Sequence, residues 1–180
     1  AIRQVKMFFK QKRPIDAAKL FKRIGLFYEK KFAENLTRPL LECVIFAFED
    51  ATEKYEDDYH LSWNIEKQNK DKKEFSNLNK RLSVYLELNS LIKRRDILKR
   101  DLEYFVAEDE GYITTMTKNV KDFVSSYQDV IDRLKNEEDT ATKHVIVSLE
   151  KDLDAFLKGE AVRNFIIESA KEELAEAEEI

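Results

Sequence analysis

The sequence predicts an all-α protein, a multi-helix bundle with long antiparallel, coiled-coil-like helices. Glycine occurs 3 times and proline twice in 180 residues, too few to punctuate a sheet, because average usage is about 7% and 5%. Charged residues make up 38% of the chain and hydrophobic residues 43%, a combination typical of amphipathic helices with solvated outer faces. Apolar residues recur at steps of three and four along most of the chain, which is the spacing of one helix face.

The N-terminal third of the chain contains two clear helix-start signals. Residues 1–13 are predicted to form a peripheral amphipathic helix. We expect this helix to end before Pro14, which either breaks it or begins the next helix. From Ile15 onward a wide apolar stripe predicts a helix that is buried against more than one neighbour. Thr37 and Pro39 then offer a cap and a first-turn proline, so a second long helix is expected to begin there.

A polar stretch divides the middle of the chain. Residues 66–74 read EKQNKDKKE and contain no apolar side chain, so we expect them to stay out of the core, as the tip of a helical hairpin or as an exposed spacer. No proline or glycine lies between Pro39 and Gly111, and this region is therefore compatible with one helix or with two. Two helices joined near the polar stretch are favoured. Arg95 occupies the apolar seam of the second.

Three further stripes predict the C-terminal helices. The segment 113–134 has the cleanest heptad pattern of the chain. A stripe over 145–156 follows a polar interruption and is expected to end at Gly159. Residues 162–174 line a last helix with an acidic tail. All these helices are predicted to form a single helical domain over 1–180, a length usual for one domain.

The motifs of an active site are missing from the sequence. Asp57 and His60 have the i, i+3 spacing that forms half of a di-iron site in helical bundles, but His144 is preceded at that offset by Ala141. There is no glycine-rich phosphate loop and no nucleophile motif, and the single Cys43 is predicted to be a small buried hydrophobe. We therefore expect that the protein is not an enzyme and that it holds neither a metal ion nor a cofactor. A metal-dependent helical-bundle enzyme is the minor alternative.

Charge is unevenly distributed along the chain. Residues 1–32 hold 10 Lys and Arg against 2 Asp and Glu, whereas residues 139–180 hold 5 against 11. A basic beginning indicates either an anionic partner or packing of the first helices on the acidic remainder, and both alternatives stay open. Nucleic acid is disfavoured by a pI near 5.5. No stretch approaches the ~18 to 20 apolar residues of a membrane-spanning helix, so a cytoplasmic or peripheral membrane location is favoured.

Two basic regions are candidates for contact with an anionic membrane surface. Lys and Arg side chains attract acidic headgroups, and aromatic side chains insert at the interface. The candidate residues are Lys6, Phe8, Phe9, Lys10, Lys12, Arg13, Lys19, Lys22, Arg23, Lys67, Lys70, Lys72 and Lys73. The alternative is a soluble interaction bundle whose grooves bind another helical protein, with a homodimer as one form of that association.

Residues 82–103 read LSVYLELNSLIKRRDILKRDLE. This segment resembles the second long helix of sorting-nexin BAR domains, in which a comparable run of Tyr, Leu and Lys-Arg-Arg-Asp occurs. The resemblance implies a curved antiparallel dimer, with three long helices in each subunit, that senses or bends membranes. The first functional hypothesis is therefore a non-enzymatic helical scaffold that binds or remodels membranes through its basic amphipathic helices.

Overall fold

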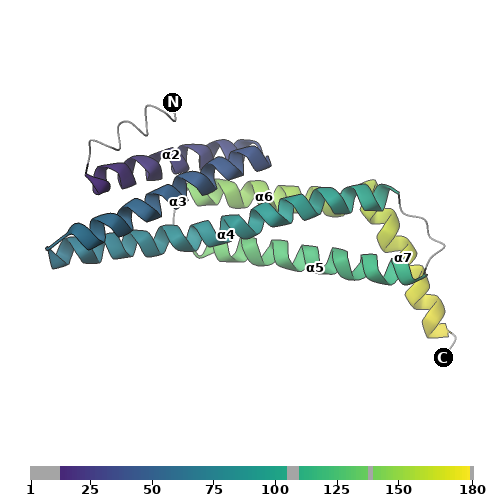
Figure 1. Ribbon diagram of the computed structural model, residues 1–180. Helices are drawn as coiled ribbons and strands as arrows, with labels where there is room; N and C mark the ends of the chain where they lie inside the picture. Colours follow the sequence, from purple (N-terminus) through teal and green to yellow (C-terminus); the bar gives the residue numbers. More distant parts are fainter. Residues whose placement is uncertain (1–12, 105–109, 138–139, 179–180) are drawn as a thin grey trace.

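Six α-helices make up the regular secondary structure of the part of the chain described by this computed structural model, residues 13–104, 110–137 and 140–178. No strand occurs in these ranges, so the predicted all-α, multi-helix fold class is confirmed (Figure 1). The helices are α2 (Pro14–Glu34), α3 (Arg38–Leu61), α4 (Ile65–Glu103), α5 (Glu110–Lys135), α6 (Thr140–Lys158) and α7 (Glu160–Glu178). The amphipathic helix predicted over 1–13 lies outside the described residues, except for Arg13.

The turn between α3 and α4 lies earlier in the chain than the sequence predicts. The side chain of Asn64 caps α4 by accepting hydrogen bonds from the backbone N–H groups of Glu66 at 3.0 Å and Lys67 at 3.4 Å. The turn is therefore formed by residues 62–64, and residues 66–74 lie inside the first turns of α4. The region after Pro39 consists of two helices, as favoured from the sequence.

The helices are arranged around the long α4 (Figure 1). Helices α2 and α3 pack together, and α3 pairs with the first part of α4 as a hairpin. Helix α5 lies along the remainder of α4, while α6 contacts both α2 and α5. The α3–α4 turn and the C-terminal helix α7 lie at opposite ends of the molecule, so features at these two ends can act independently.

One continuous apolar cluster contains side chains from all six helices. Its largest fully buried aromatic members include Phe32, Phe48, Phe123 and Phe156, and full burial of each such side chain contributes about 1.5–3 kcal/mol. Cys43, predicted to be buried, is only partly buried. The extent of the domain over 1–180 stays a prediction, since the structure describes only part of that range.

A buried polar network ties α2 to α4. Nη2 of Arg81 donates to the two carboxylate oxygens of Glu29 at 2.5 and 2.6 Å and lies 3.1 Å from the hydroxyl of Thr142 on α6. Tyr85 donates from its hydroxyl to Glu29 at 2.8 Å. All four side chains are buried. The charges are therefore paired inside the core, as buried charges must be, and this network fixes α2 and α6 against α4.

Candidate functional site

Three large apolar side chains are exposed at the α3–α4 turn. Trp63 is 100% exposed, Leu61 66% and Ile65 73%, and we call these three residues the apex. Single exposed hydrophobic residues are normal on protein surfaces. Three within five consecutive residues, at one extremity of the molecule (Figure 1), form an apolar projection. The apex is not predicted by apolar periodicity, because these residues follow no helical period. The signal that the sequence offers is the segment LSWNI directly before a polar stretch.

Next to the apex, residues of α2 and α4 line a half-open cavity of about 450 Å³ with Tyr55 of α3 in its wall. We call it the basic cavity. Its lining consists of Ile15, Lys19, Lys22, Arg23, Leu26, Tyr55, Lys67, Lys70, Asp71 and Glu74. The two basic regions predicted separately from the sequence, one on α2 and one on α4, thus meet in one site.

The other predicted residues do not line this cavity. Lys72 and Lys73 are exposed on α4 outside it. Arg13 is exposed at the start of α2, and its Nε lies 3.5 Å from a carboxylate oxygen of Asp16. Lys6, Phe8, Phe9, Lys10 and Lys12 lie outside the described residues.

Positive charge exceeds negative charge in the lining of the basic cavity. Lys22 forms an ion pair with Glu74, with Nζ and Oε2 2.7 Å apart. Among the described residues, Lys19, Arg23 and Lys70 form no ion pair, and all three are exposed. The cavity therefore keeps three cationic side chains that are not neutralised by a direct partner, and it attracts anions.

Two carboxyl groups are buried at the basic cavity, one in its lining and one beside it. Asp58 of α3 is 4% exposed and Asp71 of α4 is 2% exposed, and Oδ2 of each has no hydrogen-bond partner among the described residues. Burial raises the pKa of Asp71 to about 6, and the hydrogen bond to Asp58 and the negative charge of Asp58 act in the same direction. The positive charges of Lys67 and Lys19 oppose this rise. Lys67 also lies 3.6 Å from Oδ2 of Asp58. The expectation that 66–74 stays out of the core is therefore wrong at Asp71.

The wall of the basic cavity also contains a phenol. Tyr55 is 3% exposed, and burial, followed by the negative charges of Glu74 and Asp71, raises its pKa to about 12. The hydroxyl of Tyr55 therefore stays protonated at physiological pH and is available as a hydrogen-bond donor.

The described residues offer no metal centre and no membrane-spanning helix. The side chains of Asp57 and His60 are 48% and 68% exposed, and His60 lies 4.0 Å from Glu56 on the same helix. Nowhere in the described ranges do three His, Cys, Asp or Glu residues come together as metal ligands. Within the same ranges, no helix is both long and apolar enough to cross a bilayer.

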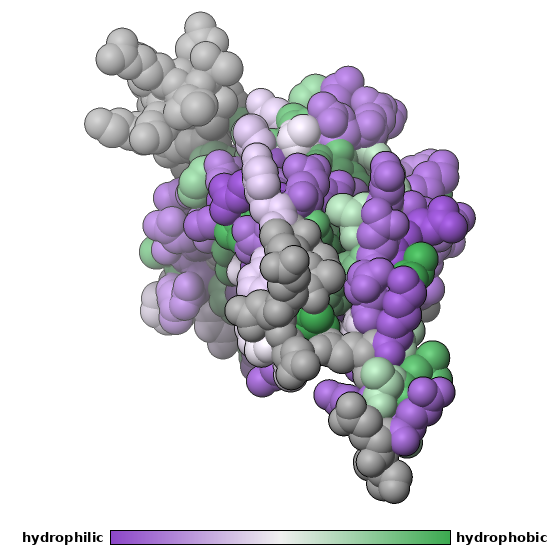
Figure 2. All heavy atoms as spheres, turned by 90° about the vertical axis from the view of Figure 1, so that its right-hand side faces the viewer, coloured by the Kyte–Doolittle hydropathy of each residue, from purple (hydrophilic) through white to green (hydrophobic). Residues whose placement is uncertain are grey.

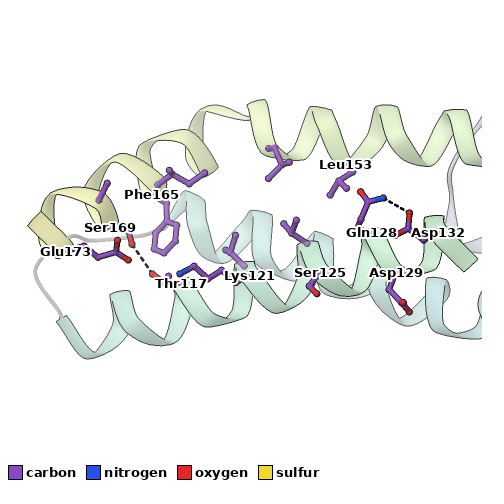
Figure 3. Close-up of a pocket in the computed structure, with 15 residues that line it drawn as sticks. Thr117, Lys121, Ser125, Gln128, Asp129, Asp132, Leu153, Phe165, Ser169 and Glu173 are labelled. Atoms are coloured by element: carbon purple, nitrogen blue, oxygen red, sulfur yellow. Dashed lines mark hydrogen bonds between the residues drawn. The ribbon is translucent and has the colours of Figure 1, made fainter.

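A second concave surface lies between α5, α6 and α7, at the other end of the molecule. This groove has a volume of about 880 Å³, and Figure 3 shows Leu153 and Phe165 facing it from α6 and α7. Thr117 and Ser169 bridge it with a hydrogen bond of 3.2 Å between their hydroxyl oxygens. Viewed from this end, the surface is mainly hydrophilic with smaller hydrophobic areas (Figure 2). Ile166 and Ile167 of α7 are about half exposed, at 48% and 52%.

The chain matches no known protein family, no curated protein and no solved structure. The features of the described residues that bear on function are the apex, the basic cavity and the groove.

Proposed function

We propose that the protein is a non-enzymatic helical scaffold that binds an anionic membrane surface with the end that carries the apex and the basic cavity. The observation that carries this proposal is the position of a fully exposed Trp63 beside the cationic cavity. Lys67 lines the cavity and lies two residues after the apical Ile65, which is about 3 Å along a helix axis. Apolar insertion and headgroup attraction therefore act at the same place.

The two contributions are individually weak and jointly sufficient. Full burial of a large apolar side chain contributes about 1.5–3 kcal/mol, and each Lys or Arg near an acidic surface about 1 kcal/mol. The apex supplies three apolar side chains, and the cavity supplies three cationic side chains that form no ion pair among the described residues. Stable association with a bilayer generally needs two such signals. Partial burial of the apex together with the cavity charges supplies both.

The resemblance of residues 82–103 to sorting-nexin BAR domains also supports the proposal of membrane binding. In the structure these residues form the C-terminal half of α4, the helix that begins at the apex. Membrane remodelling, rather than binding alone, is the further function that this resemblance suggests.

The single tryptophan of the sequence gives the proposal a direct test. We expect the emission of Trp63 to be that of an indole in water for the free protein, and to shift to shorter wavelength when vesicles with acidic lipid are added. Neutral vesicles are expected to give a much smaller shift. No shift with acidic vesicles, together with no co-sedimentation, would contradict the proposal.

Two variants distinguish insertion of the apex into the bilayer from non-specific adsorption of the protein to vesicles. Trp63→Ala is expected to lower co-sedimentation with acidic vesicles several-fold, because it removes the largest apolar side chain of the apex. The matched control is Phe46→Ala, which removes another exposed aromatic, 61% exposed, from the middle of α3. Equal loss in both variants would show that the apex has no special role.

A second candidate function is association with another helix through the groove between α5, α6 and α7. It is favoured by the volume of the groove, about 880 Å³, and by the apolar residues Ile167 and Leu174, which are exposed on α7. The partner proposed for the groove is a second copy of the chain. Sedimentation velocity over a range of concentrations tests it. We expect a dimer that Val124→Glu, a change in the groove lining, converts to a monomer; a wild-type monomer at all concentrations would contradict it.

A further inference from the structure

The basic cavity is a concave, half-open surface rather than a flat charged one. Its volume of about 450 Å³ lies within the range of about 300–1,000 Å³ that is usual for small-molecule sites. Ile15 and Leu26 give it an apolar wall. Cationic side chains line it from two helices that are far apart in sequence, Lys19, Lys22 and Arg23 from α2 and Lys67 and Lys70 from α4.

The cationic groups are partly fixed in place before any ligand binds. Glu74 holds the ammonium of Lys22 at 2.7 Å, and Asp58 lies 3.6 Å from that of Lys67. Tyr55 adds a hydroxyl that stays protonated, since its pKa is raised to about 12 by burial and by nearby carboxylates. Such pre-organisation lowers the entropy lost on binding.

The charge balance indicates the class of anion. Five cationic side chains line the cavity, and three acidic side chains face them: Asp71 and Glu74 in the lining and Asp58, 3.6 Å from the ammonium of Lys67. An excess of two positive charges remains when all three acids are ionised. A phosphomonoester carries about −1.5 to −2 charges and three strong acceptor oxygens at pH 7. A carboxylate or a phosphodiester carries only one negative charge and uses this excess less fully.

From these observations we propose that the basic cavity is a specific site for phosphomonoester groups, as presented by a phosphorylated inositol headgroup or by a free phosphate. This inference rests on the proposed membrane function where the phosphate belongs to a lipid. It goes further in assigning the headgroup chemistry to one cavity, with Lys19, Arg23 and Lys70 as its unpaired anion-binding side chains.

The test compares two kinds of vesicle with equal total surface charge. One contains phosphatidylinositol bisphosphate and the other phosphatidylserine, both in phosphatidylcholine. We expect the full chain to bind the first at least tenfold more tightly in co-sedimentation. Equal affinity for the two vesicles would overturn the proposal while leaving charge-driven membrane binding intact.

Soluble probes distinguish the two sources of phosphate. In titration calorimetry, soluble inositol trisphosphate is expected to bind and to compete with the bisphosphate vesicles, which supports the cavity as the site. Inorganic phosphate that binds as tightly as inositol trisphosphate also supports the phosphomonoester site and identifies free phosphate as its ligand. No binding of either soluble probe would contradict a built site.

Two triple variants with the same loss of charge locate the site. Lys19→Gln, Arg23→Gln and Lys70→Gln together are expected to lower inositol trisphosphate affinity at least tenfold. The control combines Lys72→Gln, Lys73→Gln and Lys80→Gln, exposed lysines of α4 outside the cavity lining, and is expected to change affinity less than twofold. All six positions are exposed, so both variants are expected to keep the wild-type circular dichroism.

The same comparison distinguishes a phosphomonoester site in the cavity from membrane attachment of the protein. An equal loss in both triple variants would overturn the cavity as a specific site, although acidic vesicles would still shift Trp63 emission. Retained binding of inositol trisphosphate without any vesicle binding would support the cavity and contradict membrane attachment.

Discussion

Arg95 of α4 donates from Nη1 to both carboxylate oxygens of Asp152 on α6, at 2.7 and 2.6 Å. Tyr127 of α5 donates from its hydroxyl to Oδ2 of the same carboxylate at 2.6 Å. Arg95 is 9% exposed, so its charge lies largely inside the bundle. Burial raises the pKa of Tyr127 and the charge of Asp152 raises it further, so the phenol stays protonated as a donor. These three side chains hold α4, α5 and α6 together.

We predict that Asp152→Ala lowers the free energy of unfolding by about 3 kcal/mol, because it leaves a buried guanidinium without its main partner. The measurement is urea denaturation followed by circular dichroism. Asp96→Ala is the control, since it removes the other carboxylate bonded to Arg95 but one whose side chain is 58% exposed, and such an exposed pair contributes at most about 1 kcal/mol. A similar loss in the two variants would contradict the assigned role of Asp152.

Gly25 allows α2 to approach α3 closely. A Cβ atom at this position would lie 2.5 Å from Cδ1 of Phe48, and Phe48 is fully buried. Its ring stacks on Tyr85 with centroids 6.3 Å apart and lies 5.4 Å from the guanidinium carbon of Arg81. The ring therefore has little freedom to move away from an added methyl group.

We predict that Gly25→Ala lowers the free energy of unfolding by about 1–3 kcal/mol, in spite of the better helix propensity of alanine, because overpacking outweighs that gain. Thermal denaturation measures the effect. Adding Phe48→Leu should recover part of the loss if the clash is its cause. A more stable Gly25→Ala variant would show that the two helices separate easily.

The helices themselves could be predicted from the sequence, because an apolar stripe is a local pattern. The heptad over 113–134 became α5, and Gly159 separates α6 from α7 as expected. The partner of Arg95 could not be predicted, although this residue was recognised in an apolar seam. Asp152 lies 57 residues away, and local periodicity carries no information on which helices pack side by side.

The same distinction between local sequence pattern and long-range packing applies to the candidate site. Its cationic residues could be selected from the sequence, but the meeting of Lys19 and Lys70 in one cavity depends on how α2 and α4 both pack on α3. Asp71 was assigned to solvent because its neighbours are all polar. Burial of a carboxyl group beside Asp58 requires a shared proton or a nearby cation, which only the tertiary structure supplies.

Tyr85 provides a test of the buried network of Glu29 and Arg81. Burial, and then the charge of Glu29, raises the pKa of Tyr85 well above its ordinary value, and the phenol donates to that carboxylate at 2.8 Å. We predict that Tyr85→Phe lowers the free energy of unfolding by about 1.5–3 kcal/mol, the range for a hydrogen bond to a charged group. Tyr104→Phe, at a residue that is 78% exposed, should change it by less than about 0.5 kcal/mol in the same urea titration.

Asp71 should make stability depend on pH. Its pKa of about 6 in the folded protein, raised by burial and by Asp58, lies above the value near 3.9 of an unperturbed Asp. The folded state therefore binds this proton more tightly than the unfolded state. The stability that protonation provides is fully present below about pH 4 and is lost as the pH rises through about 6.

We predict that Asp71→Asn, which cannot ionise, gains stability relative to wild type as the pH rises from 4 to 7.5, by an amount on the order of 1–2 kcal/mol. Urea denaturation at four or five pH values measures the difference, in which the titration of the remaining groups largely cancels. Asp57→Asn, at a neighbour with a side-chain exposure of 48%, is the matched control for removing a carboxyl group outside the buried pair. If the Asp71→Asn difference is flat with pH, burial beside Asp58 does not raise the pKa of Asp71.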